Sequence, residues 1–152
     1  TEVLLYAASR AQLVAQEIRP RLAAGEIVIC DRYADSTLAY QGYGRGLDLK
    51  ALHHLLDFAT GGLTPDLTLY LDISAEAGLQ RRQHAAEDGA EWNRMDAQSL
   101  EFHRRVREGY VALIAGDPVR WVTVEAANER DAIHKQICAA VLYRLAELEK
   151  PG

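Results

Sequence analysis

The sequence predicts an α/β fold in which a parallel sheet carries helices on both faces. Three short apolar runs, at residues 27–30, 67–71 and 121–124, alternate with longer segments of helical periodicity. The run at 27–30 is continuously apolar, and the other two have apolar residues on both faces, which is typical of strands that are covered on both sides. Strands and helices that alternate in this way form βαβ units, and the strands of such units run parallel.

The composition indicates one domain and narrows the classes of partner. The 152 residues, of which 49% are apolar and 26% charged, suit a single globular domain over residues 1–152. A net charge of −5 gives no overall attraction to nucleic acid or to a membrane surface, so local arginine clusters must bind any anionic ligand. No apolar run reaches the roughly 18 residues of a membrane span. The two cysteines lack metal-site spacing, and we expect a reduced, cytoplasmic protein.

A long amphipathic helix is expected at the start of the chain. Apolar residues recur there at spacings of three and four. Pro20 must kink this helix or begin a new turn in it, and Gly25 ends it. The residues expected on its buried face are Leu4, Ala8, Ala11, Ala15, Ile18 and Leu22.

Turn and capping residues divide the rest of the chain. A polar stretch with three glycines, Gly42, Gly44 and Gly46, follows the run at 27–30, and we expect it to be a loop. Asp48 is expected to cap a helix that Gly61 and Gly62 close. Three further helices are expected to begin at polar residues, namely at Ser74, at Asp96 and at Asn128.

An acidic residue comes directly after each predicted strand. The three residues are Asp31, Asp72 and Glu125. Ligands of open α/β sheets bind beyond the carboxyl ends of the strands. After the first strand the sequence reads D-R-Y-x-x-S, and an Asp at a strand end can hold Mg²⁺ or order its water shell. Arg32 beside it can clamp a phosphate through two hydrogen bonds. The alternative is an ordinary surface ion pair between Asp31 and Arg32.

Two other arginine patterns point to a ligand, each with a structural alternative. Tyr6 and Arg10 are neighbours at i and i+4, so a ring that stacks and a guanidinium that donates can together receive a flat base. They can equally be a half-buried tyrosine with an arginine over it. Arg81 and Arg94 bound a polar segment that can close over a phosphoryl group, or form a solvated helical hairpin.

Six pieces of the sequence, in collinear order, resemble the thymidylate kinase (dTMP kinase) family. D-R-Y-x-x-S with the upstream aromatic and arginine pair is fairly specific among nucleoside monophosphate kinases. The resemblance covers essentially the whole chain. The pieces are L-L-Y-A-A-S-R at 4–10, D-R-Y-A-D-S-T-L-A-Y-Q-G at 31–42, G-R-G at 44–46, P-D-L-T-L-Y-L-D at 65–72, G-L-Q-R at 78–81 and F-H-R-R-V-R-E-G-Y at 102–110.

The resemblance implies phosphoryl transfer from ATP to dTMP, which gives dTDP and ADP. Tyr6 would stack on thymine, Arg10 would contact its carbonyl edge and Thr37 its ring N–H. Tyr40 would lie against the sugar and favour the deoxy form. The implied substrate-binding set is Tyr6, Arg10, Arg32, Ser36, Thr37, Tyr40 and Gln41.

The resemblance also implies how the second substrate and the metal are handled. Asp31 and Arg32 match the family's residues for Mg²⁺, with Asp31 acting directly or through water, and for the acceptor phosphate. A lid at about residues 82–95 would close over ATP, and Glu125 with Ala126 would lie beside adenine. The implied catalytic set is Asp31, Arg32, Arg81 and Arg94. Asn93 and Asp96 flank Arg94 where the family often has Asp and Glu, which leaves the alignment of the lid arginines open.

The fold implied by the resemblance is a three-layer αβα parallel sheet of the P-loop nucleoside monophosphate kinase type. The sequence has no G-x-x-x-x-G-K-[ST] motif, it begins with Thr1, and its single methionine is Met95. We therefore expect the domain to be incomplete at its N-terminus. The alternatives are a kinase of a related deoxynucleoside or nucleoside monophosphate, and a non-catalytic nucleotide-binding protein. Family members commonly form homodimers, and we expect one here.

Overall fold

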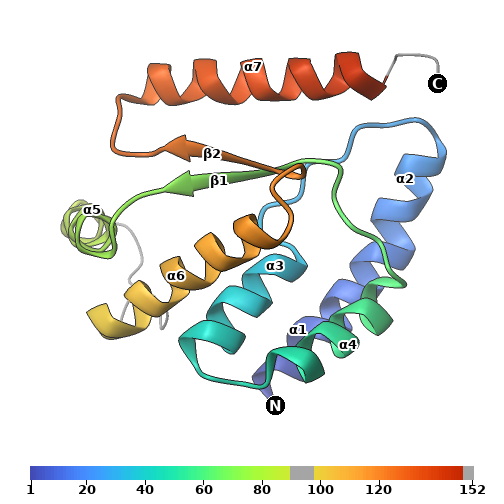
Figure 1. Cartoon of the computed structure of the whole chain (residues 1–152), viewed down its shortest axis with the longest axis horizontal. Coiled ribbons are helices and arrows are strands. Elements are labelled where there is room, and N and C mark those ends of the chain that lie inside the picture. Colours follow the sequence, from blue (N-terminus) through green and yellow to red (C-terminus); the bar gives the residue numbers. More distant parts are fainter. Residues whose placement is uncertain (90–97, 149–152) are drawn as a thin grey trace.

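Two parallel strands form the sheet in the computed structural model, which describes residues 1–89 and 98–148 (Figure 1). Strand β1 (Thr68–Asp72) pairs with β2 (Trp121–Glu125), in a register that runs from Thr68 opposite Trp121 to Asp72 opposite Glu125. Both strands therefore end at the same edge of the sheet. The α/β class and the parallel direction agree with the prediction.

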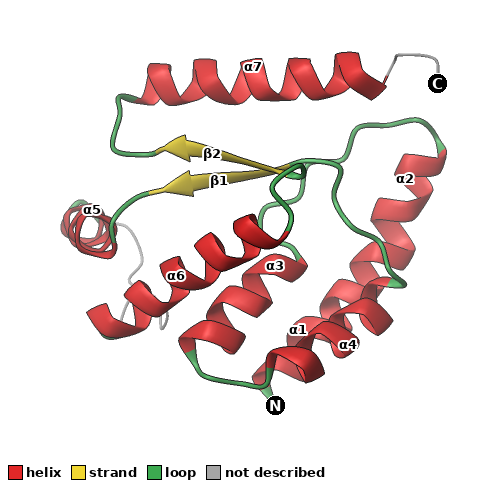
Figure 2. Ribbon diagram, in the orientation of Figure 1, coloured by secondary structure: helices red, strands yellow, loops and turns green. Residues whose placement is uncertain are grey.

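Helices make up most of the remaining chain, and Figure 2 shows how they surround the strands. In chain order they are α1 (Glu2–Leu13), the π-helical segment η1 (Val14–Ile18), α2 (Arg19–Ala23), α3 (Ala34–Thr37), the π-helical segment η2 (Leu38–Gly44), α4 (Leu49–Thr60), α5 (Ala75–Glu87), α6 (Leu100–Gly116) and α7 (Arg130–Leu148). Within the described parts of the chain, no helix combines the length and the apolarity that a membrane span requires.

The first helix continues through Pro20 with a π-helical turn in front of it. Pro20 has no N–H to donate to the preceding turn, and η1 widens the helix just before this position. The helix ends as expected at Gly25, whose φ is +79°, with Glu26 N donating to Arg21 O at 3.0 Å. Insertion of the π turn also shifts the side chains around the helix axis.

The predicted buried face of this helix is largely wrong. Of the expected residues only Ile18 is buried, whereas Leu4 is 59% exposed and Leu22 is 40% exposed. The buried positions are Ala7, Val14 and Ile18, and Arg10 lies on the same stripe as they do. The reason is that packing partners far along the chain, and not periodicity alone, select the covered face.

The segment at residues 27–30 is not a strand, which corrects the prediction. It has no β partner among the described residues, and Figure 2 shows the chain between α2 and α3 as loop. The side chain of Ile27 is 68% exposed and that of Ile29 is 94% exposed. An apolar run acquires strand structure only when a neighbouring strand accepts its backbone hydrogen bonds.

The glycine-rich stretch is also not the loop that was expected up to Gly44. Gly42 and Gly44 are buried inside η2, where a Cβ on Gly42 would collide with the side chain of Leu49 and one on Gly44 would approach Phe102 to 2.7 Å. These glycines therefore let η2 lie close against α4 and α6. Close packing explains their presence better than chain flexibility does.

The helix caps agree with the prediction more closely than the glycine-rich stretch does. The carboxylate of Asp48 accepts from Ala51 N at 2.7 Å, and Ser74 caps α5 in the same way. Ser99 caps α6, and the expected start at Asp96 lies outside the described residues. Helix α7 begins at Arg130, and Asn128 instead donates its side-chain amide to Glu125 O at 3.3 Å.

The contact between α6 and η2 forms one of the main cores. Ala39 packs with Phe102 and Val106 in this interface. Gly109 of α6 faces Tyr43, and a Cβ on Gly109 would lie 2.7 Å from the Cβ of Tyr43. The helix axis can approach η2 this closely only because position 109 has no side chain.

Replacement of Gly109 by alanine is expected to destabilise the fold by about 1–3 kcal/mol, because the added methyl group must displace Tyr43. Gly116→Ala is the matched control on the same helix, since no atom lies within 4 Å of a Cβ at that position. It should leave stability unchanged or raise it by up to about 1 kcal/mol. Urea unfolding measures both. Equal stability of the two variants would show that η2 and α6 are not in close contact.

Candidate functional site

A cavity of about 230 Å³ opens between α1 and the α3–η2 segment. Its walls come from two stretches of sequence, residues 6–10 and 32–41, that the fold brings together. The residues that line it are Tyr6, Arg10, Arg32, Ser36, Thr37, Tyr40 and Gln41. These are the same residues that the sequence analysis grouped as a substrate-binding set, so the structure gathers the whole set around one cavity.

Arg10 reaches the cavity from the buried stripe of α1. Its Nη1 donates to Thr37 Oγ1 at 3.1 Å, and its guanidinium carbon lies 5.6 Å from the centroid of the Tyr33 ring. Burial lowers the pKa of Arg10, although the electrostatic influence of Tyr33 acts in the opposite direction. A partly desolvated guanidinium of this kind gains most from a ligand that offers it hydrogen-bond acceptors.

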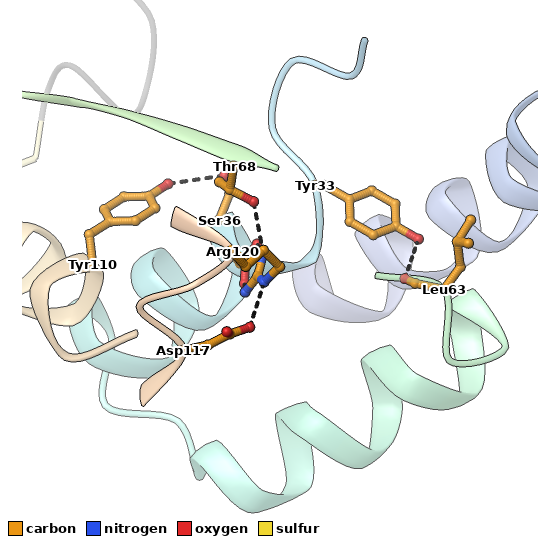
Figure 3. Close-up of polar contacts among 8 residues, drawn as sticks. Tyr33, Ser36, Leu63, Thr68, Tyr110, Asp117 and Arg120 are labelled. Carbon is orange, nitrogen blue, oxygen red and sulfur yellow. Dashed lines mark hydrogen bonds and ion pairs between the residues drawn. The ribbon is translucent and has the colours of Figure 1, made fainter. Parts of the chain in front are cut away.

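Arg32 has a left-handed backbone. Its φ is +61°, and among the described residues it is the one non-glycine residue with positive φ. Tyr33 holds this turn in place, because its ring is buried against Val14 and Ile18 and its hydroxyl donates to Leu63 O at 3.1 Å (Figure 3). A strained residue that its neighbours fix in this way is a frequent feature of binding sites.

The side chain of Arg32 carries a charge that the described carboxylates do not neutralise. Its guanidinium carbon lies 4.9 Å from the centroid of the Tyr40 ring, and it forms no ion pair with a described residue. The cavity thus contains two guanidinium groups, those of Arg10 and Arg32, between aromatic rings. This combination suits a ligand with a flat, polar ring and an anionic group.

Two cavity residues, Gln41 and Ser36, are held by side chains that were not predicted to belong to the site, namely those of Glu2 and Tyr110. The amide of Gln41, which is 3% exposed, donates to Glu2 Oε1 at 2.8 Å. The hydroxyl groups of Ser36 and Tyr110 are 3.0 Å apart (Figure 3), and burial raises the pKa of Tyr110.

Asp35 adds a further bond, to Arg120, with oxygen-to-nitrogen distances of 2.8 and 3.0 Å. One local signal points to Asp35: it is a second acidic residue inside the D-R-Y-A-D-S segment. Its partner is 85 positions away, so no local spacing could identify the pair.

The acidic residues at the strand ends have different environments. Arg107 holds both carboxylate oxygens of Asp72, at 2.8 and 2.7 Å, and lowers the pKa of that carboxyl. Asp31 is exposed and pairs with no described cation. Arg81 donates to Ala126 O at 2.6 Å, so this arginine lies at the end of β2 beside Glu125. Arg94 falls outside the described residues.

The donors available for a metal ion are sparse. The described residues contain no group of three His, Cys, Asp or Glu side chains that could bind a cation. Asp31 alone offers an exposed carboxylate next to Arg32. One hard oxygen donor suits a Mg²⁺ ion that keeps its waters and takes its other ligands from phosphate groups.

A larger, more open hollow of about 440 Å³ lies between η2 and α6. None of the residues that line it belongs to the predicted site. Its two arginines are already engaged, since Arg105 donates to Gly44 O at 3.0 Å and Arg45 pairs with Glu2 at 3.4 Å. The smaller cavity is therefore the better candidate.

Comparison with known proteins agrees on one family. A family model described as thymidylate kinase matches residues 1–137. A thymidylate kinase of Roseiflexus castenholzii is 53% identical over 158 residues, which cover 97% of this chain and 69% of the relative. The thymidylate kinases of a Roseiflexus species and of Herpetosiphon aurantiacus are 52% and 45% identical, with 98% of this chain and 70% and 72% of those relatives covered.

Two substitutions at position 32 test the backbone strain there. Arg32→Gly and Arg32→Ala both remove the guanidinium, but only glycine adopts a φ of +61° without steric conflict. The glycine variant should be about 1 kcal/mol more stable than the alanine variant in urea unfolding. If alanine is as stable as glycine, the left-handed conformation is not a source of strain.

The Asp72–Arg107 pair should make the free energy of unfolding depend on pH in the acidic range. Because Arg107 lowers the pKa of Asp72 in the folded state, the ionised carboxylate stabilises the fold above the unfolded pKa, and this contribution is lost as pH falls through the folded pKa. Asp72→Asn should therefore be about 1 kcal/mol less stable than the parent near neutral pH, since the side chain of Arg107 is 44% exposed and water weakens the pair. Unfolding measured down to about pH 3 should show this difference shrinking. A difference that stays constant with pH would contradict the assignment.

Proposed function

Because the chain belongs to the thymidylate kinase family, we propose that the cavity between α1 and the α3–η2 segment is its dTMP site. The reaction of the family is transfer of the γ-phosphoryl group of ATP to dTMP, which gives dTDP and ADP. One observation carries the site assignment: the arginines, hydroxyls and rings that a pyrimidine nucleotide requires converge on this cavity. The names of the relatives do not favour a different nucleotide as acceptor.

The chemistry of the cavity supports thymine as the base. Thymine offers carbonyl acceptors and one ring N–H donor on its polar edge. The guanidinium of Arg10 can donate to a carbonyl, while Thr37 Oγ1, which already accepts from Arg10, keeps a second lone pair for the ring N–H. The exposed ring of Tyr6 is available to stack on the face of the base.

The position of Tyr40 supports a preference for deoxyribose. Its ring is held by edge contacts with Phe102 and Tyr110, at centroid distances of 6.1 and 6.4 Å, and by Arg32 over its face. A ring fixed on several sides cannot move away from an additional hydroxyl group. We infer that Tyr40 lies against the sugar and leaves no room for a ribose 2′-hydroxyl.

Arg32 is the proposed ligand of the acceptor phosphate. Its uncompensated guanidinium can form two charge-assisted hydrogen bonds to phosphate oxygens and so hold the nucleophilic oxygen in position. Asp31 is the residue that would hold Mg²⁺, directly or through water, and the ion would supply charge neutralisation on the phosphate groups. Catalysis then rests on positioning and electrostatic stabilisation, without a covalent enzyme intermediate.

The ATP side of the site involves the end of β2. Arg81, bonded to Ala126 O, is proposed to neutralise charge on the transferred group, and Glu125 with Ala126 to lie beside adenine. The lid proposed at about residues 82–95 includes Arg94. The first part of this proposed lid, residues 82–87, is the end of helix α5.

Three broader features belong to the same proposal. A three-layer αβα sheet would cover the extended apolar residues Ile27 and Ile29, which are exposed here. A homodimer would bury the exposed side chains of Leu5 on α1 and Phe58 on α4, which are 65% and 87% exposed. A cytoplasmic location agrees with the two free cysteines, Cys30 and Cys138.

Calorimetric titration of the 152-residue chain with dTMP tests the acceptor site, with dUMP, dCMP and the ribose analogue TMP alongside. Selective binding of dTMP is expected. Arg10→Ala and Arg32→Ala should each weaken it about tenfold or more, because each removes a charged hydrogen-bond donor. Arg21→Ala is the matched control, since Arg21 on the same long helix pairs, among the residues that the structure describes, only with exposed Glu17 and Glu26. A chain that is folded and binds none of these nucleotides would refute the assignment.

A further inference from the structure

Three consecutive residues of α3 are bonded to three different elements. Asp35 binds Arg120, immediately before β2, through both carboxylate oxygens. Ser36 is hydrogen-bonded to Tyr110 of α6, and Thr37 accepts from Arg10 of α1. Ser36 and Thr37 line the cavity, whereas Asp35 does not. The bond of Asp35 therefore acts on the cavity through the helix that carries its two neighbours.

Helix α3 is the first turn of a longer helical segment, because it continues without a break into η2. The η2 part is held by its buried residues, among them Ala39, which packs against Phe102 and Val106. The beginning of α3 has weaker local support: its N-cap residue Tyr33 makes no side-chain capping bond, and it follows Arg32, whose backbone is left-handed. The side-chain bonds of Asp35, Ser36 and Thr37 therefore act on the end of this segment that η2 does not hold.

Arg120 is a rigid anchor for this helix. Besides Asp35 it donates to Thr68 Oγ1 at 2.8 Å and to Asp117 Oδ2 at 3.0 Å (Figure 3). Its guanidinium carbon lies 4.9 Å from the centroid of the Trp121 ring. Its side chain is 17% exposed and that of Asp35 is 14% exposed, so water screens the pair weakly.

We propose that the Asp35–Arg120 ion pair is a positioning device for the nucleotide pocket, which orients Ser36 and Thr37. The inference rests on the proposed dTMP site. Neither residue of the pair touches the nucleotide. Their effect on binding is transmitted through α3.

Burial of the pair adds an electrostatic effect. The side chain of Asp35 is 14% exposed. If Arg120 is removed, this poorly hydrated carboxylate loses its partner, and the start of α3 must shift to bring it into water. Loss of Arg120 should therefore weaken nucleotide binding more than loss of the Asp35 charge, and removal of both charges should restore part of the affinity.

The test compares dTMP affinity by calorimetry for Arg120→Gln, Arg120→Lys, Asp35→Asn and the double variant Asp35→Asn/Arg120→Gln. Arg120→Gln should weaken binding about tenfold or more, since small displacements of positioning groups have effects of this size. Arg120→Lys keeps the charge but loses the two parallel bonds, so its affinity should lie between those of Arg120→Gln and the parent. The double variant should bind more tightly than Arg120→Gln alone.

Arg104→Gln is the matched control, because the pair of Arg104 with Glu76 joins α5 to α6 without touching α3. It should leave dTMP affinity unchanged. Thermal unfolding of every variant separates loss of folding from loss of positioning. If Arg120→Gln does not fold, the test is made with Asp35→Asn, which keeps the shape of the side chain. Folded Arg120→Gln and Asp35→Asn variants that bind dTMP as the parent does would overturn the proposal. A parent chain that binds no dTMP would instead refute the site itself, and the inference would fall with it.

Discussion

The guanidinium of Arg120 joins parts of the chain that are far apart in sequence, and the arrangement around the cavity depends on it. Its donors reach the start of β1, the turn after α6 and the short helix α3, while its plane covers Trp121. A half-buried arginine such as Arg120 contributes to a fold only when most of its donors are satisfied, because its desolvation is otherwise unfavourable. The network around Arg120 meets this condition, and it fixes α3 relative to the sheet.

The close approach of η2 to its neighbours is the second constraint on the cavity. Gly42 and Gly44 allow η2 to pack against α4 and α6, and Gly109 allows the same approach from the side of α6. Tyr40 and Gln41 are carried on this π-helical segment, so the spacing of three helices determines where the walls of the cavity lie. Rare π-helical geometry at a ligand site is a recurrent association in proteins.

The parts of the fold that were predictable are those with a local physical cause. Asp48, Ser74 and Gly25 act through bonds or backbone angles within a few residues, and the structure agrees with each. The residues that line the cavity are those to which the resemblance assigns substrate binding, and this assignment stays a prediction.

The parts that were missed depend on partners far along the chain. The residues at 27–30 have strand composition but no neighbouring strand among the described residues, and composition cannot show this. The glycines at 42 and 44 indicate a loop unless it is known that Leu49 and Phe102 lie against them. The Asp35–Arg120 bond spans 85 positions and follows no periodicity. The predicted buried face of the first helix was wrong for the same reason, as the exposure of Leu4 illustrates.

Arg10 lies on the stripe of α1 that also carries Ala7 and Val14, so one helix face supplies both core packing and a wall of the cavity. A leucine at position 10 would suit the packing better than a partly desolvated cation does, and selection for stability alone would favour it. Recognition of a ligand accounts for the arginine at this position, whereas packing alone does not. Position 10 is therefore a place where a lineage that had abandoned the reaction would be expected to drift toward an apolar residue, and its identity serves as a marker of whether the pocket is still in use.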